Sequence, residues 1–129
     1  MKIVRHAALW SLLVLCSLVV LGCGQGGQEA DETKPMSEVK AEAEKMDTGQ
    51  LRAMAETYKK AIVAKQADIE KVTAKLKEIP LTSMMSEEAK ALKSDIANLN
   101  SSITALKARF DVYYEKLKAA GGDLTGLQL

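Results

Sequence analysis

The stretch that decides the fold is residues 85–120, MSEEAKALKSDIANLNSSITALKARFDVYYEKLKAA. Its apolar and aromatic residues recur in steps that alternate between four and three, without a break. They are Met85, Ala89, Leu92, Ile96, Leu99, Ile103, Leu106, Phe110, Tyr113, Leu117 and Ala120. A spacing that averages 3.5 residues keeps one side of a helix against a partner, and it persists for about five heptads. The stretch therefore predicts a long helix whose seam is covered by another segment.

An earlier stretch carries a seam of the same kind. Its members are Leu51, Ala55, Tyr58, Ile62, Lys65, Ile69, Val72, Leu76 and Ile79. At 1.5 Å per residue it is about 42 Å long, against about 52 Å for the later seam. Asp47, followed three residues later by Gln50, predicts a capping box at the start of this helix. Pro80 ends it, because proline lacks an amide hydrogen and disfavours helical geometry at the preceding residue.

The connection over 80–85 is short, and a short connection between two helices makes them antiparallel neighbours. Ser86, with two acidic residues after it, predicts the start of the second helix. Gly121 and Gly122 predict its end. The expected fold is therefore all-α, an antiparallel two-helix coiled-coil hairpin. Its segments are a lead-in helix over 36–46 with Ser37 as N-cap, helices over 47–79 and 86–120, a hairpin domain over 36–122, and a loosely held tail over 123–129.

The N-terminus has the pattern of a secretory signal. Lys2 and Arg5 precede an apolar run over 7–21, which is short for a transmembrane helix. The run ends in Val20-Leu21-Gly22-Cys23, which resembles the lipobox of bacterial lipoproteins. An uncleaved membrane anchor and an incidental thiol at position 23 are the alternatives. The other cysteine, Cys16, follows Leu15 and does not fit the small residue that the lipobox requires before its cysteine.

The resemblance implies that residues 1–22 are removed and that Cys23 carries the lipid. In that family a diacylglycerol is attached to the cysteine thiol, and the new amino group is often acylated, for example with palmitate. Two or more acyl chains make such an anchor stable. Gly24, by analogy with proteobacterial sorting, permits outer-membrane delivery. Residues 24–35, GQGGQEADETKP, are predicted to be a flexible linker, so that 23–35 form a lipidated tether on the cell envelope.

Composition argues against several functional classes. The formal net charge is +1, without the basic surplus of a nucleic-acid binder. The single histidine, His6, lies in the predicted signal, so the mature chain would keep no histidine and no cysteine besides Cys23. Phosphate-binding loops, nucleophile elbows and metal-ligand spacings are missing from the sequence. We therefore expect neither an enzyme nor a metal or cofactor site.

Four residues are candidate partner contacts: Met84 and Met85 at the turn, Tyr114 beside the second seam, and Leu117 near its end. Leu117 lies where the second seam outruns the first, so it must pack on the lead-in helix or on a partner. The alternative for the methionines is filler at the closed end of the hairpin. Lys65, the one charged seam residue, either selects a partner or packs its stem and extends its amine to solvent.

These observations predict a membrane-anchored, non-catalytic coiled-coil protein that binds a protein partner or a second copy. An oligomeric holdase-like chaperone and a non-covalent cell-wall tether are the alternatives. The first resembles long-hairpin periplasmic chaperones in architecture alone. The second resembles the major outer-membrane lipoprotein, whose family links to peptidoglycan through a C-terminal lysine. This chain ends instead in Leu129.

Overall fold

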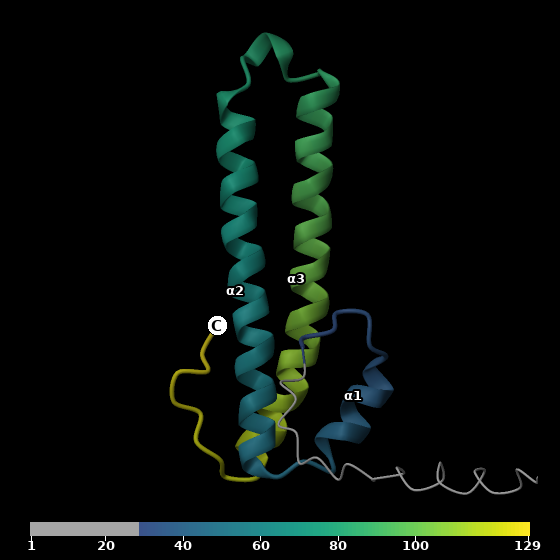
Figure 1. The fold of residues 1–129 in the computed structure, drawn as a ribbon, viewed down its shortest axis with the longest axis vertical. Helices are drawn as coiled ribbons and strands as arrows, with labels where there is room; N and C mark the ends of the chain where they lie inside the picture. The colour runs from purple at the N-terminus through teal and green to yellow at the C-terminus, as the bar shows by residue number, and fades with distance from the viewer. Residues whose placement is uncertain (1–28) are drawn as a thin grey trace, which may run out of the picture.

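The computed structural model describes residues 29–129, so the predicted signal and Cys23 lie outside the described residues. Within residues 29–129 the structure has three α-helices and no strand, which confirms the all-α class. The elements are α1 (Met36–Ala43), α2 (Thr48–Glu78), the 3₁₀-helix η1 (Leu81–Ser83) and α3 (Glu87–Ala119). Figure 1 shows α2 and α3 side by side, joined by η1 at one end, with α1 beside α3 near the other end. We call the end at η1 the tip and the end near α1 the base.

The start of α2 is fixed by the capping box that the sequence predicts. The Asp47 carboxylate accepts a hydrogen bond from the Gln50 amide at 2.8 Å, and the Gln50 side chain accepts one from the Asp47 amide at 3.0 Å. These two bonds satisfy donors that a helix start leaves free. The helix ends when Ile79 adopts an extended conformation before Pro80.

The end of α3 is a Schellman motif. Gly121 has a φ of 69°, which favours glycine, and the Gly122 amide donates to the Leu117 carbonyl at 2.9 Å. A Cβ on Gly122 would lie 2.1 Å from Cδ1 of Leu117, so the motif also presses residue 122 onto the buried leucine. At the other end of α3, the Ser86 hydroxyl caps the helix by accepting from the Ala89 amide at 3.2 Å.

The first helix begins at Met36 as predicted, but its capping residue and its C-terminal end differ from the prediction. Pro35, not Ser37, is the N-cap of α1, because the helix begins two residues earlier than a Ser37 cap requires. The helix stops at Ala43, so it is separate from α2. Val39 and Ala43 are buried, and α1 packs against α3. Its role is to cover the base end of the α3 seam.

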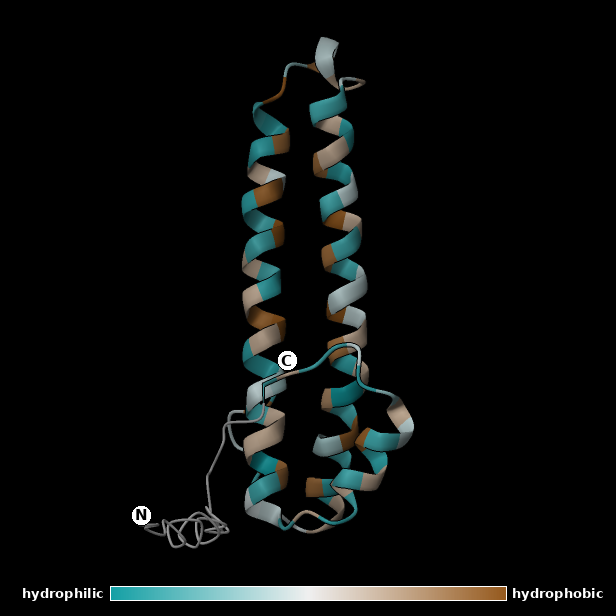
Figure 2. Ribbon diagram, turned by 45° about the vertical axis from the view of Figure 1, so that its right-hand side comes forward, coloured by the Kyte–Doolittle hydropathy of each residue, from teal (hydrophilic) through white to brown (hydrophobic). Residues whose placement is uncertain are grey.

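The core is concentrated in the base half of the molecule. Tyr58 and Tyr113 lie at its centre, 1 % and 0 % exposed, with ring centroids 5.6 Å apart in a stacked arrangement. The other buried apolar residues of this cluster are Val39, Ala43, Leu51, Met54, Ala55, Ile62, Ile103, Leu106, Phe110, Leu117 and Leu127. Figure 2 shows that apolar positions also continue toward the tip. There the seam residues Ile69, Val72, Leu76, Leu92, Ile96 and Leu99 are only partly buried.

The C-terminal tail is held more firmly than the sequence suggests. Leu127 is fully buried in the core. Arg52 donates to the backbone carbonyls of Asp123 at 2.6 Å and Thr125 at 2.9 Å, and Lys59 donates to those of Gly126 and Gln128. The expectation of a loose tail over 123–129 is therefore wrong. Leu124, Leu127 and the side chains of α2 hold it beside α2 (Figure 1).

Residues 29–35, which we call the strap, cross the helix pair before α1 begins (Figure 1). The sequence predicts that they belong to a flexible linker over 23–35. The structure instead places them in contact with α2 and α3, where the Tyr58 hydroxyl donates to the Asp31 carbonyl at 3.2 Å and the Ser102 hydroxyl donates to Glu32 at 2.9 Å. A glycine-poor, acidic segment can be ordered in this way because its partners supply matching donors.

Candidate partner-binding surfaces

Arg109 is the residue that fastens the strap most directly. Its guanidinium donates through Nε to the Lys34 carbonyl at 3.0 Å and through Nη1 to the Ala105 carbonyl at 2.7 Å, and Nη2 also reaches the Lys34 carbonyl. The residue is 8 % exposed and makes no ion pair with another described residue. Backbone carbonyl dipoles therefore compensate this buried charge, and its fork geometry fixes the strap to α3.

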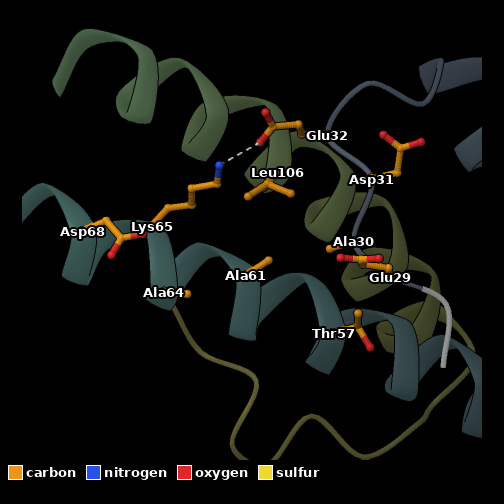
Figure 3. A pocket seen from close by; sticks show the side chains of 10 residues that line it. All are labelled: Glu29, Ala30, Asp31, Glu32, Thr57, Ala61, Ala64, Lys65, Asp68 and Leu106. Carbon is orange, nitrogen blue, oxygen red and sulfur yellow. Dashed lines mark ion pairs between the residues drawn. The ribbon is translucent and has the colours of Figure 1, made fainter. Parts of the chain in front are cut away.

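A groove of about 480 Å³ lies beneath the strap (Figure 3). Its apolar floor includes Ala61, Ala64 and Leu106, and its rim carries Glu29, Asp31, Glu32 and Asp68 against the single cation Lys65. The Lys65 amine lies 3.7 Å from the Glu32 carboxylate, so this seam lysine extends its charge to the strap. Among residues 29–129, no three histidine, cysteine or acidic side chains are grouped so that they could hold a metal ion.

Tyr58, Tyr113, Lys34 and Asp31 have pKa values shifted from their ordinary values. Burial raises the pKa of Tyr58 and that of Tyr113. The Tyr113 hydroxyl donates a hydrogen bond to the Glu42 carboxylate at 3.5 Å. The bond from Lys34 to Glu42 raises the pKa of the lysine amine. Hydrogen bonds from Thr33 hold the pKa of the Asp31 carboxyl below its usual value. Each of these shifts favours the charge state that the packed base already contains.

The tip, residues 80–86, presents the most exposed large apolar side chains. Leu81 is 90 % exposed and Met85 is 78 % exposed. The backbone below them is ordered: Ser83 donates to the Pro80 carbonyl at 2.8 Å, and the Lys93 amine donates to the Met84 carbonyl at 3.2 Å. A fixed turn therefore displays two apolar side chains to solvent, which is the chemistry of a small protein-binding surface.

The predicted contact residues fall in three different environments. Met84 and Met85 lie at the tip, and Met85 is the more exposed of the two. Tyr114 is partly buried, with its ring stacked 5.5 Å from that of Phe110. Leu117 is fully buried in the core with α1, so the expectation that it contacts a partner is wrong. The lead-in helix supplies the cover that its seam position requires.

Leu81 is a surface residue that the seam spacing does not indicate. The signal was present, because Leu81 follows the helix-ending Pro80 and belongs to neither seam. An apolar residue in a short turn outside both seams has no place in the core. Leu81 therefore belongs with Met84 and Met85 among the residues of the tip.

Comparison with protein-family models, with curated proteins and with solved structures gave no match to this chain. In the part of the chain that the structure describes, no helix has the length and hydropathy needed to cross a membrane.

Proposed function

We propose that the protein is a bacterial lipoprotein, anchored to an envelope membrane through Cys23, that acts without catalysis as a coiled-coil hairpin. In this proposal the seams of α2 and α3 face each other, and the hairpin presents its tip to a protein partner. The observation that carries the proposal is an asymmetry. The strap, nearest the proposed lipid in sequence, is fastened to the base half, whereas Leu81 and Met85 are exposed at the opposite end.

The composition of the base supports a mechanical role. The strap, α1 and the tail all converge there, so the end attached to the proposed anchor is also the end with the buried core. The helix pair beyond it has no third layer among the described elements that would enclose a substrate. Such a shape suits a spacer or a recruiting arm better than a reaction site.

The anchor is tested by the variant Cys23→Ala. Metabolic labelling with a radioactive fatty acid, followed by membrane fractionation, should show lipid on the wild-type chain and none on the variant. The matched control is Cys16→Ser, which should keep the lipid because residue 16 lies inside the discarded signal. Lipid retained on Cys23→Ala would refute the lipobox assignment.

The tip is tested by site-specific photocrosslinking in the cell. A crosslinker at position 85 should capture a discrete partner, and a crosslinker at the exposed position 97 on the α3 shaft should not. Substitution of Leu81 by serine should weaken the captured band. Equal capture at both positions would argue against a tip-directed partner.

A holdase-like chaperone is the second candidate, favoured by the exposure of apolar side chains at the tip. It requires several copies to enclose a client. Light scattering on a soluble form beginning near Gln25 separates the two functions, because a strict monomer could not enclose a client and would contradict the chaperone. Suppression of aggregation of a denatured envelope protein would support the chaperone.

A further inference from the structure

The strap determines where the chain leaves the folded body. Glu29 lines two grooves, one with Thr57 and the other with Met54 and Tyr58, so it lies beside the third turn of α2. From Glu29 onward the chain is fastened to α2 and α3 through the Asp31 carbonyl, the Glu32 carboxylate and the Lys34 carbonyl. The segment that leads to Cys23 is therefore attached to the side of the helix pair, about three turns of α2 from the base.

The length of chain between Cys23 and Glu29 sets a limit on distance. Six residues span at most about 20 Å when fully extended. The base end of α2 lies nine residues before Thr57, about 14 Å along the helix. The tip lies beyond the C-terminus of α2 at Glu78, more than 30 Å away in the other direction at about 1.5 Å per residue. The tether is therefore long enough for the base to meet a lipid surface, but too short for an upright molecule to place its tip there.

Charge disfavours the arrangement in which the helix pair lies flat. The tether leaves from the strap side, so that side would face the lipids. The groove there carries the carboxylates of Glu29, Asp31, Glu32 and Asp68 against the amine of Lys65. An anionic bilayer repels such a surface. At the base, by contrast, the carboxylates of Glu44 and Glu115 are paired with Lys116 at 3.6 Å and with Lys118 at 3.9 Å, and Lys45 is exposed in the α1–α2 connection.

We infer that the base is a membrane-contacting surface, and that the helix pair stands on the lipid headgroups with its tip about 45–55 Å above them. This inference rests on the proposed lipidation of Cys23. The range follows from the length of α2, about 46 Å for its 31 residues, and from the reach of the tether. It also defines the partner, which must present its binding surface at that height above the anchoring membrane.

Energy transfer to lipids tests the standing orientation with the lipidated protein in vesicles of phosphatidylethanolamine and phosphatidylglycerol. Donor dyes are placed through Ala120→Cys at the base and Met85→Cys at the tip, both exposed positions, and the acceptor is a headgroup-labelled lipid. We expect strong donor quenching at position 120 and at least fivefold less at position 85. Insertion of twelve Gly/Ser residues after Gly26 should reduce the quenching at position 120, because the tether then no longer holds the base down.

The outcomes separate this inference from the proposed function. A chain that carries no lipid and does not bind the vesicles refutes the lipoprotein proposal itself, and Cys23→Ala supplies that baseline. An anchored chain with equal quenching at the two positions lies flat, which overturns the standing orientation. Quenching at position 120 that is unchanged by the longer tether overturns the claim that tether length sets the height, because the base then stays on the lipids without being held there by the tether.

Discussion

The two halves of the helix pair use the same sequence pattern but reach different degrees of burial. In the base half, Tyr58, Ile62, Leu106 and Tyr113 are each 1 % exposed or less. In the tip half, Ile69, Val72, Ile96 and Leu99 keep the seam register and remain partly exposed. The difference shows that two helices alone cannot enclose a seam, and that additional segments decide which part becomes a core.

Those additional segments are short, and each uses a different type of contact. The strap is held by carbonyl and carboxylate groups, α1 by Val39 and Ala43, and the tail by Leu127 together with Arg52 and Lys59. Hydrogen bonds to charged groups contribute roughly 1.5–3 kcal/mol each, which is comparable with burying one aliphatic side chain. A few polar contacts can therefore keep a short segment in place over an apolar seam.

The largest expected effect comes from truncating one isoleucine side chain in the base half and comparing it with the same truncation in the tip half. Ile62→Ala should destabilise the protein by about 3 kcal/mol, because it opens a cavity in the closed core. Ile69→Ala, one heptad away on the same helix, should cost about 1 kcal/mol because its site is already partly open to water. Chemical denaturation followed by circular dichroism measures both. Equal losses would mean that the two halves are packed alike.

The second prediction breaks the fastening of the strap. Arg109→Met keeps an apolar stem but removes the donors to the carbonyls of Lys34 and Ala105, and it should cost about 2 kcal/mol. Hydrogen exchange should rise over residues 31–40 and stay unchanged at the tip. The neighbouring exposed Lys107→Met is the matched control. Exchange in residues 31–40 that stays at the wild-type level would show that Arg109 does not hold the strap.

The third prediction concerns alkaline pH. The folded state raises the pKa values of Tyr58 and Tyr113 above the ordinary value of 10.0, so the unfolded chain loses these protons first as the pH rises. Stability from these residues is therefore complete below about pH 10 and falls as the pH increases further. The Lys34 amine acts in the same direction, because its pKa is also raised.

Tyr113→Phe removes one of these groups and should make the loss of stability above about pH 10 less steep. At neutral pH the variant should lose no more than about 1 kcal/mol, because its hydroxyl donates only a long bond to Glu42. Denaturation midpoints across this pH range give the measurement. An unaltered slope would assign the alkaline loss to other groups.

The smallest expected effect on stability is at the tip. Leu81→Ser and Met85→Ser should each change the free energy of unfolding by less than about 0.5 kcal/mol, because both side chains are already in water. Leu81→Ser should nevertheless weaken capture of a partner by a crosslinker at position 85, which separates binding from folding. A loss of several kcal/mol would contradict the exposure of these two side chains, because only buried side chains contribute that much.

The sequence by itself determined α2, α3 and their ends. The seam spacing, the Asp47–Gln50 capping box, Pro80 and the Gly121–Gly122 pair are local signals, because each acts on the backbone within a few residues of itself. The candidate tip was also accessible from the sequence, because Met84 and Met85 lie in the connection before Ser86 caps the second helix, although Met85 also continues the seam spacing and is exposed rather than packed. What these local signals could not indicate was how much of the seam would be covered.

The tertiary structure alone decided the composition of the base. No local pattern indicates that Arg109 fastens the backbone at Lys34, 75 positions earlier, or that Arg52 and Lys59 hold the tail. It also decided that Leu117 is buried and unavailable to a partner. These contacts join residues far apart in the chain through donors and acceptors common to many segments. Their partners are selected only when α2 and α3 have brought the charges and carbonyls within hydrogen-bonding distance.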